Sequence, residues 1–231
     1  MAMSRRLYFL HISKTAGTSL RSLLAAHNEV SDRKIDRFGH DVTFRMVRWL
    51  KPRARLLFFV RDPIARAESG FYDRYRKSQP AYFFEWSKRE AAAFALFSDF
   101  NSLAEALTDP DPTRQQAAKK AVKSIRHLRW SLQHFLISPQ FLEKNRQRIF
   151  FIGDQASFDT DIATLRRKAG IAASAALPSD ETGAHRANRA EKVPLSDIAI
   201  TNLKAHYAAD YLIYDWCKKN RAAINQAPSD L

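Results

Sequence analysis

Hydrophobic residues gather in three short runs, and each run is followed by a polar turn and then by apolar residues at helical spacing. The runs cover residues 6–12, 55–60 and 148–152. The middle run is almost continuously apolar, which is typical of a strand buried on both faces of a parallel sheet. Three successive strand-then-helix units predict an α/β fold, in which a parallel sheet is flanked by helices.

Capping and turn residues mark where the predicted helices begin and end. Asp62 and Pro63 are suited to cap and open a helix over residues 63–75. Gly170 is suited to end a helix over residues 159–169. Both helices directly follow a predicted strand, so the strand-then-helix alternation rests on capping and helix-ending residues as well as on periodicity.

The stretch 77–147 interrupts this alternation and is mostly helical in pattern, most clearly over residues 102–107 and 114–136. A further helix is predicted over residues 196–218. We expect a single domain over residues 1–231, with the stretch 77–147 as a helical insertion that covers one end of the sheet.

Charge changes the picture more than composition does. The chain has 38 Lys and Arg against 24 Asp and Glu, a formal net charge of +14. Such a surplus concentrates polyanions near the surface, which leaves nucleic acid, anionic membrane, a phosphorylated small molecule and an acidic polysaccharide open as partners. With 45% hydrophobic residues the chain can fill a core, which excludes an intrinsically disordered protein.

Cysteine content and run length bear on the compartment. Cys217 is the single cysteine, so an intramolecular disulfide and a cysteine-based zinc cluster are both excluded. The longest apolar runs, 56–60 and 91–97, are far shorter than the ~20 residues of a membrane-spanning helix. No export segment is expected, and we expect a cytoplasmic protein without a membrane span.

The polar turn after the first run, residues 13–19, has the composition of a phosphate-binding loop. Gly17 and its small neighbours allow backbone N–H groups to approach an anion at the start of a helix. The turn is not a Walker loop, because Lys14 precedes the glycine instead of following it. A tight turn with a solvated lysine remains the alternative interpretation.

A second polar motif follows the middle run, at residues 61–69. Arg61 lies where the strand ends, while Arg66 and Ser69 share one face of the next helix. A guanidinium and a hydroxyl that converge there would suit a second phosphate. In the alternative, Arg61 pairs locally with Asp62 and Ser69 is only packed.

Together the two motifs resemble those of sulfotransferases that use 3′-phosphoadenosine 5′-phosphosulfate (PAPS), particularly carbohydrate sulfotransferases and their bacterial relatives. Residues 11–19 resemble the family's 5′-phosphosulfate loop, with Ser13 in place of the usual proline. Residues 61–71 resemble its 3′-phosphate motif, Arg-Asp-Pro-x-x-Arg-x-x-Ser-x-aromatic, with Glu68 at a usually apolar position. Gly39-His40 resembles the Gly-His pair that the family has between the two motifs, and segment 185–189 falls where the family has a mobile basic loop over the nucleotide.

The resemblance implies a P-loop-like sulfotransferase fold, PAPS as the donor, PAP as the product and no metal. It also implies which residues bind the nucleotide. These are Lys14, Thr15, Ala16, Gly17, Thr18, Ser19, Arg61, Ser69, Arg186 and Arg189.

The chemistry of sulfuryl transfer agrees with two catalytic candidates. Negative charge grows on the leaving nucleotide, and Lys14 can stabilise it. The attacking hydroxyl must lose a proton, and His40 is the best candidate base, with an ordinary pKa near 6.5. His11 is the next candidate. His127 and His134 share a helical face, which is more often packing or solvent than a metal site.

The insertion carries a basic row that suggests an acidic acceptor such as a uronic-acid glycan, although a solvated face is the alternative. The row consists of Arg114, Lys119, Lys120, Lys123, Arg126 and Arg129. Two other functions remain open. A nucleotide-dependent kinase would need a Walker loop and a magnesium-binding carboxylate, and a non-catalytic basic protein for nucleic acid or acidic glycan would leave the two phosphate motifs unexplained.

Overall fold

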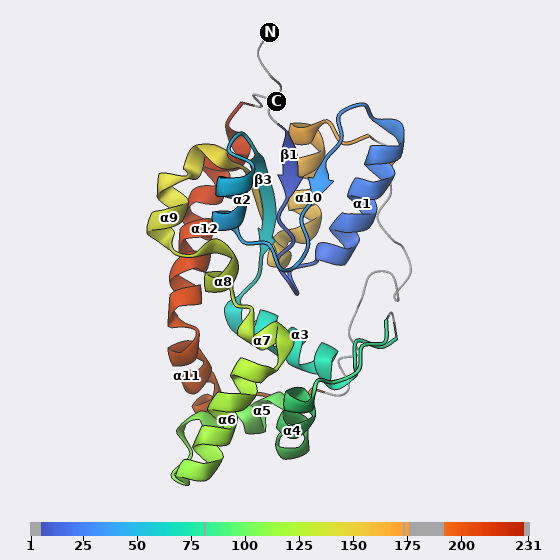
Figure 1. The fold of residues 1–231 in the computed structure, drawn as a ribbon. Coiled ribbons are helices and arrows are strands. Elements are labelled where there is room, and N and C mark those ends of the chain that lie inside the picture. Colours follow the sequence, from blue (N-terminus) through green and yellow to red (C-terminus); the bar gives the residue numbers. More distant parts are fainter. Residues whose placement is uncertain (1–5, 81, 173, 176–191, 229–231) are drawn as a thin grey trace.

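The structure is a computed structural model that describes residues 6–80, 82–172, 174–175 and 192–228. Within these ranges the centre is a sheet of four parallel strands in the order β2-β1-β3-β4 (Figure 1). The strands are β1 (Leu7–Phe9), β2 (Asp36–Arg37), β3 (Arg55–Val60) and β4 (Ile149–Asp154). The parallel sheet with helices packed against it confirms the predicted α/β class.

Both faces of the sheet are buried, which explains the apolar strand sequences. Leu56 and Phe58 of β3 belong to one hydrophobic cluster, and Leu57 and Phe59 belong to another on the opposite face. The first face is covered by α2 (Phe44–Leu50), α8 (Leu132–Leu136), α9 (Pro139–Lys144) and α12 (Ala208–Gln226). The second is covered by α1 (Gly17–Val30) and α10 (Phe158–Ala169) (Figure 1).

The order of the strands brings the two phosphate-type motifs together. β1 pairs with β2 on one side and with β3 on the other, so successive strands are added to opposite sides of β1. Ligands of open parallel sheets bind at such a switch point, beyond the carboxyl ends of the strands. The loop after β1 and the motif after β3 therefore begin side by side.

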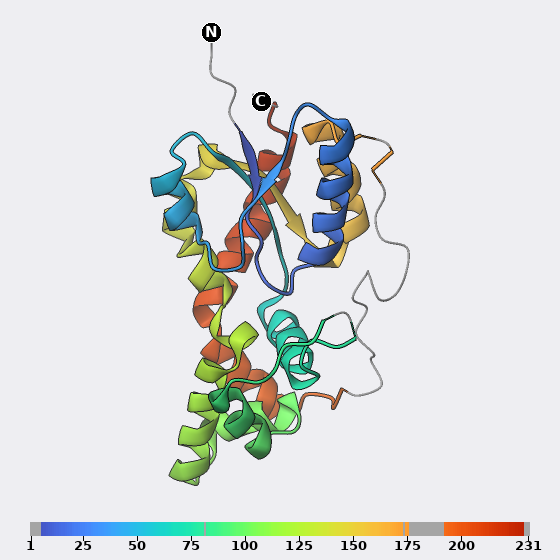
Figure 2. The same ribbon diagram turned by 45° about the vertical axis from the view of Figure 1, so that its right-hand side comes forward.

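A second group of helices lies beyond the carboxyl ends of the strands, at the lower end of Figures 1 and 2. These helices share a hydrophobic cluster that includes Phe71, Phe94 and Phe100. The helices are α3 (Pro63–Tyr75), α4 (Lys88–Leu96), α5 (Phe100–Glu105), α6 (Pro112–Ser124), α7 (Arg126–Arg129) and α11 (Asp197–His206). Short 3-10 turns occupy Ala106–Thr108, Arg146–Arg148 and Gln155–Ser157. Helices from the predicted insertion thus cover the end of the sheet where the motifs lie.

The structure also differs from the predicted elements. β2 was not predicted, because two residues are too short to show a period. The predicted helix 114–136 is three helices, since the backbone is extended at Ile125 and again at Ser131. The predicted helix 196–218 is interrupted at Tyr207, which separates α11 from α12.

Candidate active site

The loop after β1 is shaped to expose backbone N–H groups. Lys14 and Ala16 both adopt the left-handed backbone conformation, with φ of 65° and 68°. Ala16 precedes α1 and offers no side-chain cap, and the first turn of α1 has no acidic residue. The first N–H groups of α1 consequently lack an intrahelical or capping acceptor, which is the arrangement that binds anions at helix starts.

Gly17 is required at the start of α1 by a close approach to the strand. A Cβ atom on Gly17 would lie 1.9 Å from Nε2 of His11, which is buried at the end of β1. Any larger residue would displace either the imidazole or the helix. Gly17 therefore allows α1 to start directly against the strand end.

Lys14 points to α3 and not into open solvent. Its Nζ lies 2.9 Å from Oδ1 of Asp73, while Nε2 of His127 in α7 lies 3.2 Å from Oδ2 of the same carboxylate. Burial alone would raise the pKa of Asp73, but the hydrogen bond from His127 and the charge of Lys14 hold that pKa far below its usual range. The carboxylate is thus ionised and shared by two side chains.

His127 is held on α3 at three points. Nη1 of Arg66 donates to the His127 carbonyl at 3.0 Å, and Asp73 accepts from the imidazole. Between them, a Cβ atom on Gly70 would lie 2.7 Å from the Cβ of His127, so only glycine leaves room. Arg66, Gly70 and Asp73 lie on one face of α3 at helical spacing, and this face seats α7.

Arg66 serves this helix contact and is not exposed to a ligand. Its side chain is fully buried, and Nη1 also donates to the carbonyl of Trp130 at 3.0 Å. Ser69, which sequence spacing places on the same face of the helix, is half-buried. The structure thus separates a positioning arginine from the arginine at the strand end.

Arg61 follows β3 and reaches the loop after β1. Its Nη1 makes a long contact of 3.5 Å with the carbonyl of Lys14. Burial lowers the pKa of the Arg61 guanidinium, and the charges of Glu68 and Asp62 oppose that shift. Asp62 does not simply pair with Arg61, because it caps α3 by accepting from the N–H of Ala65 at 2.9 Å. The cap confirms the helix start predicted from sequence.

His40 lies in the loop after β2, and its ring packs against that of His11 at an interplanar angle of 42°. The two ring centroids are 3.8 Å apart. Burial, with nearby His127 and Arg37, lowers the pKa of His40 to about 4, and burial, with nearby His40 and Arg37, lowers the pKa of His11 to about 2. Both imidazoles are therefore neutral at pH 7, and the ordinary pKa expected for His40 from sequence is wrong because the ring is buried.

Residues from the loops after β1, β2 and β3 thus meet at one edge of the sheet. Residues 1–216 match the sequence profile described as the Sulfotransferase family. The chain belongs to the sulfotransferase family. No single curated protein matches the sequence. This match confirms the family that the two motifs indicate. It also shows, in general terms, that the chain is an enzyme of sulfuryl transfer.

Other expected site residues of this sulfotransferase lie either in the first turn of α1 or outside the described residues. Thr18 and Ser19 lie half-buried in the first turn of α1, next to the loop. Nothing is described for Arg186 and Arg189, which fall outside the described residues, so their roles stay predictions. In the described part of the chain, no group of three or more His, Cys, Asp or Glu side chains is arranged to hold a metal ion.

Sequence reasoning missed Asp73 and treated His127 as packing. The only local sign was Gly70, an unfavourable residue in the middle of a helix that signals a close neighbour. Its partner, His127, lies within the predicted insertion and far along the sequence, so no local pattern identifies it.

None of the helices in the described ranges is long and apolar enough to cross a membrane.

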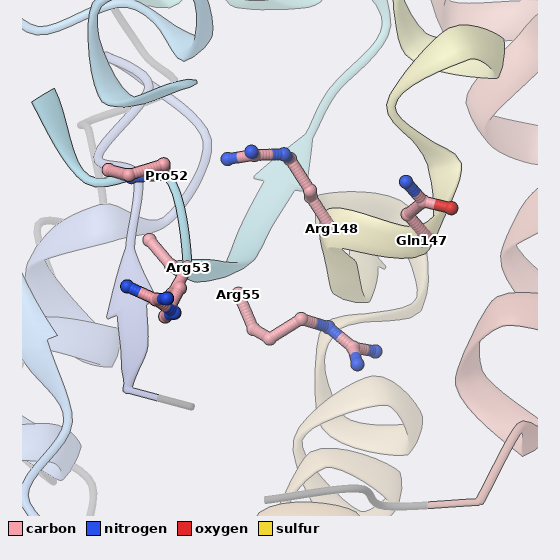
Figure 3. A pocket seen from close by; sticks show the side chains of 6 residues that line it. Pro52, Arg53, Arg55, Gln147 and Arg148 are labelled. Atoms are coloured by element: carbon pink, nitrogen blue, oxygen red, sulfur yellow. The ribbon is translucent and has the colours of Figure 1, made fainter. Parts of the chain in front are cut away.

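A basic cavity of about 320 Å³ lies at the opposite end of the sheet from this site. Figure 3 shows Arg53, Arg55 and Arg148 among its lining residues, which come from the amino ends of β3 and β4. It shares no residue with the two motifs. We therefore separate this cavity from the candidate active site.

Proposed function

We propose that the protein transfers a sulfuryl group from PAPS to a hydroxyl group on a carbohydrate. The observation that carries this proposal is the position of Lys14 and Arg61. Arg61, which follows β3, reaches the backbone carbonyl of Lys14 in the loop after β1, beside an uncapped helix start. A buried guanidinium, a lysine in the neighbouring loop and free backbone N–H groups suit a nucleotide that carries phosphates at both its 5′ and 3′ positions.

Orphaned polar atoms support an anionic ligand here. Nε of Arg61 and Oγ of Ser13 are buried and have no hydrogen-bond partner among the described residues. Buried polar groups are nearly always paired, so such atoms call for a missing partner. The residues present therefore fit a phosphorylated donor that is held by the loop, by Arg61 and by Ser69.

PAPS supplies an activated sulfuryl group, and negative charge develops on its leaving phosphate as that group departs. Lys14 stabilises this charge through its ammonium group. His40 is the candidate base, because the neutral imidazole at pH 7 has a lone pair for the proton of the attacking hydroxyl. Nδ1 of His40 is buried without a partner among the described residues, and His11 is the next candidate.

The acceptor part of the proposal rests on the basic row of α6 and α7. Arg126 and Arg129 both lie over the ring of Trp130, at 5.1 and 5.0 Å from its centroid. Lys119 and Lys123 are exposed on α6. Cations beside an aromatic ring suit an acidic sugar, which offers both charge and an apolar ring face.

We also propose a single domain and, from the lone buried Cys217, a reducing cytoplasmic compartment.

Calorimetric titration with PAP and with ATP tests this function. The experiment is done at two salt concentrations, with and without magnesium. Tight PAP binding that does not depend on magnesium, with much weaker ATP binding, is the expected result, because the site holds phosphates with cations of its own. Preference for magnesium-bound ATP, or failure to bind PAP, would overturn PAPS as the donor.

A further inference from the structure

The carboxylate of Asp73 is placed between two groups that make different demands on it. Lys14 contacts Oδ1 and His127 contacts Oδ2, and all three side chains are at least four-fifths buried, with exposures of 19, 15 and 15%. Lys14 is the group needed at the donor, yet in this structure it is bound to Asp73. For Lys14 to act, Asp73 must give it up.

A buried carboxylate that loses its cation is strongly destabilised unless another partner compensates its charge. His127 is placed to be that partner. It is fixed through its backbone by Arg66 and through its Cβ by the gap at Gly70, so its ring remains within reach of Asp73 when Lys14 moves. A side chain that served only to fill space would not need an ionised acceptor on its ring.

The hydrogen-bond geometry defines the protonation state of His127. A carboxylate only accepts, so Nε2 of His127 carries a hydrogen. Nδ1 is buried and has no partner among the described residues. In the neutral ring Nδ1 is therefore a free lone pair, available to take a proton while Nε2 keeps its bond to Asp73.

We propose that His127 is a positioning residue that compensates Asp73 when Lys14 turns to the donor, and that this exchange places one proton from water on Nδ1 of His127. Asp73 remains a carboxylate throughout, and Nε2–H donates to it before and after. The exchange rests on the proposed function, since it assumes that the anion which attracts Lys14 is the sulfuryl donor.

The charges around His127 support the direction of this exchange. Burial lowers the pKa of His127, Lys14 and Arg66 lower it further, and Asp73 raises it. His40 and His11 lie within electrostatic range of the same ring, and both are neutral at pH 7. When Lys14 moves away, one lowering charge is lost and the full charge of Asp73 acts on His127, so protonation becomes easier.

A first experiment needs no donor. The His127 ring is titrated by nuclear magnetic resonance in the wild type and in Lys14→Ala, which imitates the departure of Lys14. We expect the pKa of His127 to rise by about one unit or more, the usual effect of a nearby charge. Lys77→Ala, which removes a lysine paired instead with Glu85, is the control and should leave it unchanged. An unchanged or lower pKa in Lys14→Ala overturns the proposal.

A second experiment counts protons during PAP binding. Calorimetry near pH 7 in buffers of different ionisation enthalpy compares the wild type with His127→Gln, whose amide can still donate to Asp73 but cannot titrate. Any proton released by the PAP phosphates is common to both proteins. We expect the wild type to take up more protons, by up to one per PAP, and the control His134→Gln to match the wild type.

The two experiments separate the two proposals. PAP binding with the same proton count in the wild type and His127→Gln overturns the role of His127 and leaves the proposed function intact. Absence of PAP binding by the wild type overturns the proposed function. The Lys14→Ala titration then still decides whether the pKa of His127 depends on Lys14.

Discussion

At the scale of single residues, the site combines cations that are fixed by burial with histidines that burial keeps neutral. Arg61 is held between two strand ends, where its Nη1 reaches the carbonyl of Lys14. His40 is kept neutral by burial and by nearby positive charge. Arg61 and His40 thus each have one protonation state at pH 7, which leaves the geometry to decide what they bind.

Arg61→Ala should weaken PAP far more than adenosine 5′-phosphosulfate, which lacks the 3′-phosphate. The lost contact is a charge-assisted hydrogen bond, which contributes about 1.5–3 kcal/mol, or roughly 10- to 150-fold in Kd. Calorimetric titration of both nucleotides measures this difference. Arg114→Ala, at an exposed arginine paired with Asp109, is the control. Equal losses for the two nucleotides would contradict the assigned role.

His40→Ala should lower kcat by about 10²- to 10⁴-fold, the usual contribution of a general base. PAP affinity should stay close to that of the wild type, since His40 holds no phosphate. Because burial lowers the pKa of His40 to about 4, the neutral base is already present at pH 6. The wild-type rate should therefore stay level between pH 6 and 8 and fall only as the pH drops toward 4.

The pH profile distinguishes His40 from other bases. A wild-type rate that rises through an apparent pKa of 6 to 7 would show that a less buried group controls the reaction. A folded His40→Ala variant that binds PAP and keeps most of its activity would exclude His40 as the base, and His11→Ala would then be the next variant to measure.

At the scale of elements, α3 joins the two halves of the site. Its first residues follow the motif after β3, and Asp62 caps it. Its face of Arg66, Gly70 and Asp73 seats α7. One helix therefore positions both the donor-side arginine and the contact with the helices that cover the sheet.

Gly70→Ala tests this seat. Alanine favours the helix by about 1 kcal/mol over glycine, so an isolated helix would gain stability. Here the new Cβ would lie 2.7 Å from that of His127, and overpacking of this kind costs about 1–3 kcal/mol. We expect a lower or at best unchanged free energy of unfolding in urea, together with a displaced His127 ring signal. A clear gain in stability with an unmoved ring would show that α7 is not held there.

At the scale of the whole molecule, the charge of +14 is a property that several surfaces share. The basic row of α6 and α7 lies among the helices beyond the carboxyl end of the sheet, and the Arg-lined cavity lies at the other end (Figures 1 and 3). Only the first is on the side of the candidate site. The net charge by itself therefore does not say which surface meets the acceptor.

Replacement of Lys119, Lys123 and Arg126 by Ala should raise the KM for an acidic acceptor and weaken its salt dependence, because three exposed charges are lost. PAP affinity should change little, since none of the three is part of the two motifs. A matched triple variant, Arg53, Lys51 and Arg6 to Ala, removes three charges at the opposite end of the sheet. Equal effects of the two variants would show that the basic row acts only through its contribution to the net charge of the protein.

Local sequence patterns predict β1, β3 and β4, the loop after β1, the motif after β3 and the cap at Asp62. These features are local, because strand burial, helix capping and left-handed turns depend on neighbouring residues. Those same residues were sufficient to recognise the family. β2 escaped because two residues show no period, and the breaks at Ile125 and Tyr207 escaped because the flanking segments are both helical in pattern.

Only the tertiary structure decided what Lys14 contacts and which histidines are buried. Asp73 and His127 are separated by most of the predicted insertion, and they meet because Gly70 lets α7 lie against α3. The pKa of His40 likewise depends on His11 and His127, which come from other parts of the chain. Charge and burial act through space, so residues distant in sequence set the chemistry of a loop whose position after β1 the sequence already predicts.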